Sequence, residues 1–165
     1  MIGASPDRAS RVVVREARPT ESEELTRLAF CAKSHWGYSP EDLEAWTDEL
    51  TISPQSIDSE PTFVVEHGPR IGAVLQLGTQ AARWAIECLW VHPDSMRRGF
   101  GRALVRHAAA YAASQSQAWL VIDADPNAEA FYYALGADRV GEVQAPVVGN
   151  PQRVRLQLLL STGTI

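Results

Sequence analysis

The alternation of apolar and polar residues divides the chain into short strands and amphipathic helices. Runs rich in β-branched and aromatic residues, bounded by Gly, Pro or polar turns, predict strands. These runs lie at about 11–18, 61–66, 71–77, 84–91, 119–123, 140–143 and 154–160. Apolar residues at spacings of three and four predict helices that begin near Thr20 and Ser39 and others that span about 99–114 and 127–135.

Local signals fix where several of these elements begin. Thr20 with Glu23 has the form of a capping box, and Ser39 followed by Pro40 is a second helix start. The tetrapeptide His67-Gly68-Pro69-Arg70 predicts a hairpin turn. The resulting order is strand, two helices, three strands, helix, strand, helix and two strands. It predicts an α+β protein, a mixed sheet with helices on both faces.

A length of 165 residues and 45% hydrophobic content predict one domain with a single core, over residues 11–165. Residues 1–10 are expected to be a flexible tail. No apolar run is long enough to cross a bilayer, and charged residues interrupt the N-terminus where a signal peptide would have its apolar core. We therefore expect a cytoplasmic protein without a membrane partner.

Charge is distributed unevenly along the chain. Fifteen basic and twenty acidic residues give a net charge of −5, which argues against a nucleic-acid partner. Residues 20–60 hold ten carboxylates against Arg27 and Lys33, whereas residues 95–115 hold four arginines and no acid. Such a protein could bind a cationic and an anionic ligand side by side, although acidic helix faces also serve solubility.

The two cysteines, Cys31 and Cys88, lie far apart in apolar stretches. Without a partner motif they predict neither a disulfide framework nor a zinc site, and no metal is expected.

The most informative segment is Leu89–Leu104, which reads as a strand, a basic glycine-containing loop and a helix. A helix N-terminus presents unpaired amide donors, and glycines let successive N–H groups curl around an anion. Arginines add charge and forked donors. Leu104 stands where a dinucleotide-binding fingerprint needs its third glycine, and the Lys-Ser/Thr of a P-loop is missing. The loop therefore suits a diphosphate outside those two frameworks.

This segment resembles the signature of the GCN5-related N-acetyltransferase (GNAT) family, R/Q-x-x-G-x-G/A after a strand that often ends V-x-P. Gly99 and Gly101 fill the glycine positions and Val91-His92-Pro93 the strand end, while Met96 stands where the family usually has Arg or Gln. The resemblance implies a mostly antiparallel GNAT sheet and acetyl-CoA as co-substrate. It further implies that main-chain amides cradle the pyrophosphate at Arg97, Arg98, Gly99, Phe100, Gly101 and Arg102. The main chain of Leu89, Trp90 and Val91 would then pair with the pantetheine arm.

A second segment, Asp125–Ala137, is similar to the family element N-x-x-A-x-x-F-Y-x-x-x-G-F in slightly contracted form. The resemblance implies that Asn127 contacts the pantetheine and that Tyr132 lies beside the coenzyme A sulfur as proton donor. Taken alone, Phe131, Tyr132 and Leu135 would be read as core residues at helical spacing. The two motifs in the right order favour the family reading.

The implied chemistry is direct attack of a free amine on the thioester, which requires a proton to be removed from an ammonium whose pKa is about 10.4. Strand alternation places Glu87 on the same face as Leu89 and Val91, and we expect it to be the base; pairing with an arginine is the competing reading. His35 is the rival base. With Trp36 and Tyr38 it lies in a break between helices that commonly lines the acceptor pocket in this family, where the aromatics could face a cation or simply pack.

The leading hypothesis is an N-acetyltransferase for a primary amine of a small molecule or peptide. The alternative is a sensor that binds acetyl-CoA without turnover, and the least specific reading is an α+β domain whose glycine loop is only a turn. A homodimer is possible because dimers are common in the family.

Overall fold

The computed structural model describes residues 12–144 and 154–163, and the predicted tail 1–10 and residues 145–153 lie outside this range. Seven strands form one sheet in the order β1-β2-β3-β4-β5-β7-β6. Every neighbouring pair is antiparallel except β4 and β5. The strands are β1 (Val14–Glu16), β2 (Thr62–His67), β3 (Arg70–Gln80), β4 (Arg83–Val91), β5 (Trp119–Ala124), β6 (Asp138–Gln144) and β7 (Val154–Ser161).

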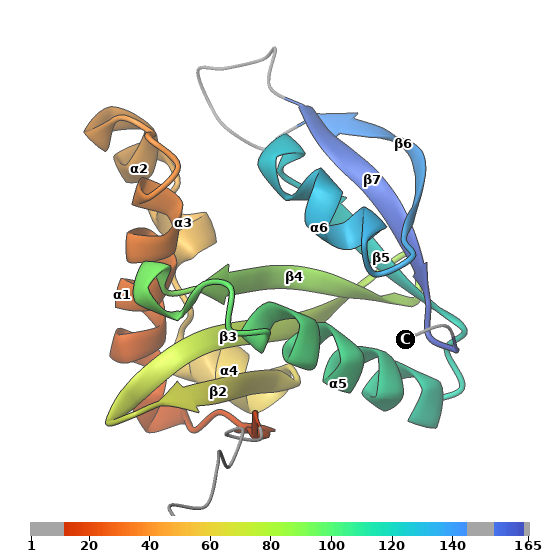
Figure 1. The fold of residues 1–165 in the computed structure, drawn as a ribbon, viewed down its shortest axis with the longest axis horizontal. Coiled ribbons are helices and arrows are strands. Elements are labelled where there is room, and N and C mark those ends of the chain that lie inside the picture. The colour runs from red at the N-terminus through yellow and green to blue at the C-terminus, as the bar shows by residue number, and fades with distance from the viewer. Residues whose placement is uncertain (1–11, 145–153, 164–165) are drawn as a thin grey trace, which may run out of the picture.

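Helices cover both faces of the sheet, as the sequence predicts (Figure 1). On one face lie α1 (Ser22–Ser34), α2 (Pro40–Ala45), α3 (Thr47–Leu50) and α4 (Pro54–Ser59). The other face carries α5 (Phe100–Ser114) and α6 (Glu129–Tyr133), and the short 3-10 turns are η1 (Pro19–Glu21), η2 (Pro93–Ser95) and η3 (Pro126–Ala128).

The larger core lies beneath α5 and α6. Fully buried Leu104 and Ala108 of α5 pack there against Leu75, Leu120 and other inward-facing residues of the sheet. Small alanines on the buried side of α5 allow the helix to approach the sheet closely. A smaller cluster on the opposite face joins α1 and α4 to β2 and β3.

The parallel contact between β4 and β5 is short, and this shapes the functional region. Only Ala85 and Ile86 pair with β5, at Val121 and Ile122. Beyond Ile86 the two strands diverge, so that the β5-β7-β6 half with α6 swings away from the β1–β4 half (Figure 1). The sheet therefore contains a V-shaped opening between the carboxyl ends of two parallel strands.

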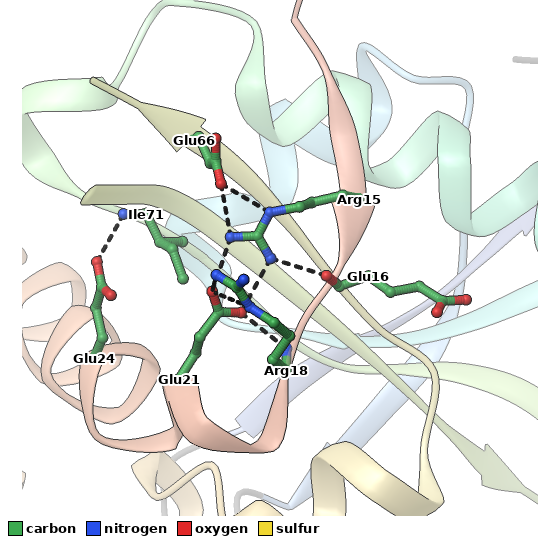
Figure 2. Close-up of polar contacts among 7 residues, drawn as sticks. All are labelled: Arg15, Glu16, Arg18, Glu21, Glu24, Glu66 and Ile71. Atoms are coloured by element: carbon green, nitrogen blue, oxygen red, sulfur yellow. Dashed lines mark hydrogen bonds and ion pairs between the residues drawn. The ribbon is translucent and has the colours of Figure 1, made fainter. Parts of the chain in front are cut away.

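A charged network anchors the start of α1 (Figure 2). Glu21 is almost fully buried and accepts hydrogen bonds from the side chains of Arg15 and Arg18, while Arg15 also reaches Glu66 on β2. Glu21 additionally accepts from the Arg18 amide at 2.8 Å. The predicted capping box of Thr20 and Glu23 is therefore wrong: Arg18 and Glu21 form the box two residues earlier, and two arginines compensate the burial of Glu21.

The predicted helix starts and the hairpin turn can each be compared with the structure. Ser39 caps α2 by accepting from the Asp42 amide, and the His67–Arg70 turn joins β2 to β3. The helix predicted to begin near Ser39 is divided at Trp46 into α2 and α3, whereas α4 was not predicted, although Ser53-Pro54 repeats the Ser39-Pro40 start. The helix expected over 127–135 is shorter, because it begins as η3. No helix in the described ranges has the length and apolar character needed to cross a membrane.

Candidate active site

The loop between β4 and α5 bends sharply just before the helix. Arg97 has φ +61° and Gly99 has φ +79°, so two residues close together adopt the left-handed conformation. A Cβ added at Gly99 would meet no atom within 4 Å. Backbone conformation rather than crowding therefore explains the glycine, and alternation of this kind turns successive N–H groups toward one side.

Six successive amides of this loop, from Arg97 to Arg102, have no acceptor among the residues that the structure describes. The first amide at this end with a main-chain acceptor is that of Ala103, which donates to the Gly99 carbonyl at 2.9 Å. Arg98 and Arg102 are exposed alongside the free amides. Free donors, the positive end of the 15-residue helix α5 and two cations fit a diphosphate.

Two residues that the sequence analysis did not single out, Ser95 and Gly72, help to pack this loop against the β2–β3 hairpin. Ser95 is 2% exposed, and its Oγ lies 2.8 Å from His67 Nδ1 at the β2–β3 hairpin. A Cβ at Gly72 would come within 3.0 Å of His67, Ser95 and Phe100. This close approach holds the loop against the hairpin, so the amides are fixed by packing before any ligand arrives.

Beyond Ile86, the edge of β4 that faces β5 has no strand partner within the described part of the chain. Its opposite edge is paired with β3 through Val91. The main chain of Leu89, Trp90 and Val91 therefore presents hydrogen-bonding groups to the V-shaped opening. Such an edge accepts an extended, amide-containing ligand as though it were a strand.

Helix α6 approaches the same opening from the other half. A Cβ at Gly101 would meet the Phe131 ring at 3.3 Å and Val91 at 3.5 Å. The loop, the end of β4 and α6 thus converge, which explains why the second glycine of the motif is needed: it lets α5 pass Phe131 closely.

Tyr132 is 5% exposed and contributes to the core beneath α6. Burial raises the pKa of its hydroxyl, and Cys88 of β4 adds a smaller electrostatic contribution in the same direction. Tyr132 on α6 is therefore within electrostatic range of Cys88 on β4. Burial likewise raises the pKa of the Cys88 thiol to about 12, so both groups keep their protons at neutral pH.

The expectation that Glu87 shares a face with Leu89 and Val91 is wrong. The β3–β4 register shifts between Gln76 and Leu77, which leaves Glu87 as the extra residue of a β-bulge. Its side chain folds over Gly78, where an added Cβ would lie 2.5 Å from the carboxylate. The bulge therefore turns Glu87 to the α1–α4 face, whereas Leu89 and Val91 face the α5 core.

Glu87 has acidic surroundings on that face. Partial burial raises its pKa most, and the charges of Glu60 and Asp123 raise it further, while Arg155 opposes them. Burial also raises the pKa of Glu60. The side-chain amides of Gln80 and Gln157 donate to Asp123 at 3.1 and 3.4 Å. Glu87 is thus a carboxylate with raised proton affinity at the bend of β4.

Asn127 lies in the turn that follows β5, at the mouth of the opening. Its side-chain amide donates to the Tyr38 hydroxyl at 3.3 Å, and that hydroxyl donates to Asp125 at 2.8 Å. The structure thus brings together one residue predicted for the cofactor and one predicted for the acceptor. Asp125 also accepts from Lys33 Nζ at 3.1 Å.

Trp36 and Tyr38, which were expected to face a cation or to pack, have different surroundings in the structure. The cation over the Tyr38 ring is the chain's own Lys33, 4.7 Å from its centroid and equally far from that of Trp46. His35 and Trp36 are exposed at the end of α1 and contact each other edge to face. The rings of Tyr38, Trp46 and Trp90 form an aromatic cage around Lys33 Nζ, and Trp36 is not part of it.

The sequence of this chain also matches a known protein family. Residues 23–137 match the family described as "Acetyltransferase (GNAT) family", which is well over half of the chain. The chain belongs to the GNAT acetyltransferase family. The match includes both the loop before α5 and the turn that carries Asn127, so this protein is an acetyltransferase that uses acetyl-CoA as co-substrate.

Solved structures support the fold of this GNAT protein. A GCN5-related N-acetyltransferase from Rhodopseudomonas palustris matches with a TM-score of 0.78 and 19% identity, covering 92% of this chain and 96% of that one. The PaiA N-acetyltransferase from Thermoplasma acidophilum, solved with coenzyme A, gives 0.67 and 14%, covering 91% and 98%. An acetyl-CoA complex from Brucella melitensis gives 0.61 and 15%, covering 93% and 89%. No curated protein matches the chain.

Lys33 and Asp125 contact the predicted site residues Tyr38 and Asn127, and the sequence analysis assigned a role to neither of them. A signal was present for Lys33, which stands four residues after Ala29 and eight after Leu25, on the buried face of α1. For Asp125 the sequence offered only its place before Pro126 and Asn127.

Proposed function

We propose that this protein transfers the acetyl group of acetyl-CoA to a primary amine by direct attack in a ternary complex. The observation that carries the proposal concerns residues 12–144 and 154–163: within them, six amides at the start of α5 have no acceptor, and the adjoining edge of β4 has no strand partner. One end suits a diphosphate and the other an extended amide-bearing arm, in the order in which coenzyme A carries them.

In this proposal the main chain from Arg97 to Arg102 holds the pyrophosphate, and the edge from Leu89 to Val91 holds the pantetheine with help from Asn127. Bound acetyl-CoA supplies an acetyl thioester to the interior of the opening. Because the loop is already braced by Ser95 and Gly72, binding needs little reordering of the chain.

Glu87 takes the proton from the incoming ammonium, directly or through water. Its raised pKa suits a base that must accept a proton near neutral pH, and the bulge turns it away from the α5 core toward the face from which an acceptor can come. Its neighbours Glu60 and Asp123 favour a cationic acceptor. His35 is the alternative base.

Tyr132 keeps its proton because burial raises the pKa of the hydroxyl. In the proposal its Oη donates that proton to the departing thiolate. Substitution by Phe would keep the packing against Phe131 and remove only the donor.

Thiol release from acetyl-CoA, measured across a panel of mono-, di- and polyamines, amino acids and peptides, tests the function. Turnover with at least one amine, dependent on Glu87 and Tyr132, is expected. Calorimetry with coenzyme A runs in parallel. Binding without turnover on any amine would contradict the proposal and favour a sensor.

A further inference from the structure

Lys33 is a buried cation between the two halves of the sheet. It is 6% exposed, near the end of α1, and the rings of Tyr38 and Trp46 lie 4.7 Å from its Nζ and that of Trp90 lies 5.8 Å away. A lysine is almost never buried unless its charge is compensated. Within the part of the chain that the structure describes, the anion that compensates it is Asp125, 3.1 Å away.

The two partners of this ion pair belong to different halves of the molecule. Helix α1 packs against β3 and β4, whereas Asp125 directly follows β5 and opens the turn that leads into α6. One carboxylate oxygen of Asp125 accepts from Lys33 and Tyr38, and the other accepts from the Asn127 amide at 3.0 Å. A single carboxylate thus joins α1 to the turn that orients Asn127.

The location of the pair matters because the strands no longer hold the halves together there. At the closed end, β4 and β5 are joined by main-chain pairing at Ala85 and Ile86, and Gln80 bonds Asp123. At the open end, β4 and β5 have no such pairing. Burial raises the pKa of Asp125, but the bonds from Asn127 and Tyr38 and the charge of Lys33 outweigh it and lower that pKa to about 2. The carboxylate is therefore ionised at all physiological pH values.

We propose that Lys33 is a positioning residue whose ion pair with Asp125 acts as a clasp, fixing the separation of β4 and β5 beyond their last paired residues and the orientation of Asn127, and so setting the affinity for coenzyme A. The inference rests on the proposed function, because it assumes that coenzyme A binds between these two strands. Neither Lys33 nor Asp125 needs to touch the reacting atoms.

The test measures the Kd of coenzyme A by calorimetry for the wild type, Lys33→Met, Asp125→Asn and the double variant. Met keeps most of the apolar stem within the aromatic cage, and Asn keeps an oxygen for the Asn127 amide. Each single variant is expected to raise Kd about tenfold, the size typical of residues that act on a ligand indirectly. The double variant should be no more than about threefold weaker than the weaker single variant, because both break one clasp.

Steady-state kinetics separate positioning from general stability. The KM for acetyl-CoA should rise with Kd, whereas kcat at saturation should fall less than about threefold. Arg27→Met is the matched control: it removes an exposed cation from the same helix, and its Kd should stay within about twofold of the wild type. Asp125→Asn carries the test if Lys33→Met does not fold.

Unchanged Kd in the folded variants, even with a lowered melting temperature, would overturn the clasp and leave Lys33 a structural residue. Fully additive losses in the double variant would also overturn it. Failure of the wild type to bind coenzyme A is a different result, because it refutes the proposed function itself.

Discussion

The loop before α5 presents main-chain amides, whereas the α1–α4 face of the sheet near Glu87 presents side chains drawn from several elements. The six amides from Arg97 to Arg102 come from one continuous segment. Glu87, Glu60, Asp123 and Arg155 come from four separate places in the chain. Because main-chain amides are the donors, the loop can keep its binding groups when its side chains change. On the Glu87 face, each side chain can be replaced on its own. If the proposed roles are right, the loop before α5 should respond to backbone changes and the face around Glu87 to side-chain changes.

The largest expected effect is a loss of coenzyme A affinity when the amide loop is altered. Gly99→Asp should raise the Kd of coenzyme A by at least about a hundredfold, because it adds a like charge to an already demanding backbone position. Gly99→Ala is the matched control, since it introduces only the left-handed strain of about 1–2 kcal/mol and has room for its Cβ. Calorimetry gives both values. Equal Kd for the two variants would mean that no phosphate lies at Gly99.

Among side-chain changes, Tyr132→Phe should lower kcat by about a hundredfold with little change in the KM for acetyl-CoA. The reason is that the ring packing remains while the proton donor is lost. Tyr133→Phe is the matched control, because Tyr133 is exposed and bonds Glu129 instead. Steady-state kinetics decide the matter: unaltered kcat in Tyr132→Phe would make Tyr132 a core residue only.

A smaller effect is expected from Glu87→Gln. Activity near pH 7 should fall about tenfold, and the loss should shrink as pH approaches the amine pKa, because a free amine needs no base. Glu60→Gln serves as control, since it removes a neighbouring charge but keeps the Glu87 carboxylate. A rate ratio between wild type and Glu87→Gln that does not vary with pH would point to His35 or to bulk water.

The smallest effect concerns stability in acid. Hydrogen bonds and positive charges outweigh burial and lower the pKa of Asp125 and of Glu21 to about 2. Carboxyls with depressed pKa stabilise the fold above their unfolded values near 4, and this contribution disappears as pH falls toward 2. Melting temperature should therefore drop through this window, and Glu21→Gln should drop less steeply. Parallel curves would exclude Glu21 as a source of the acid sensitivity.

The same contrast explains how far the sequence could predict the site. The amide loop is local: Gly99, Gly101 and the preceding strand lie within one stretch, so pattern alone located it. The direction of the Glu87 side chain depends on a bulge in the pairing of β3 with β4. Strict alternation along the sequence of β4 alone cannot predict that bulge. Lys33 meets Asp125 across 92 residues, and the cage around it required tertiary packing that local spacing does not specify. The overall order of strands and helices followed from short-range patterns. Helix α4 is too short for a clear period, and the apolar spacing of Leu43, Trp46 and Leu50 does not reveal the break at Trp46 between α2 and α3.

Amide hydrogen exchange with and without ligand tests the central claim most directly, namely that the free amides at the mouth of α5 grip a diphosphate while the β4 edge pairs with the arm. Saturating coenzyme A should slow exchange at residues 97–102 and along 89–91, and pantetheine, which lacks the diphosphate, should slow it only along 89–91. Exchange at 97–102 that is unchanged by saturating coenzyme A would contradict the account.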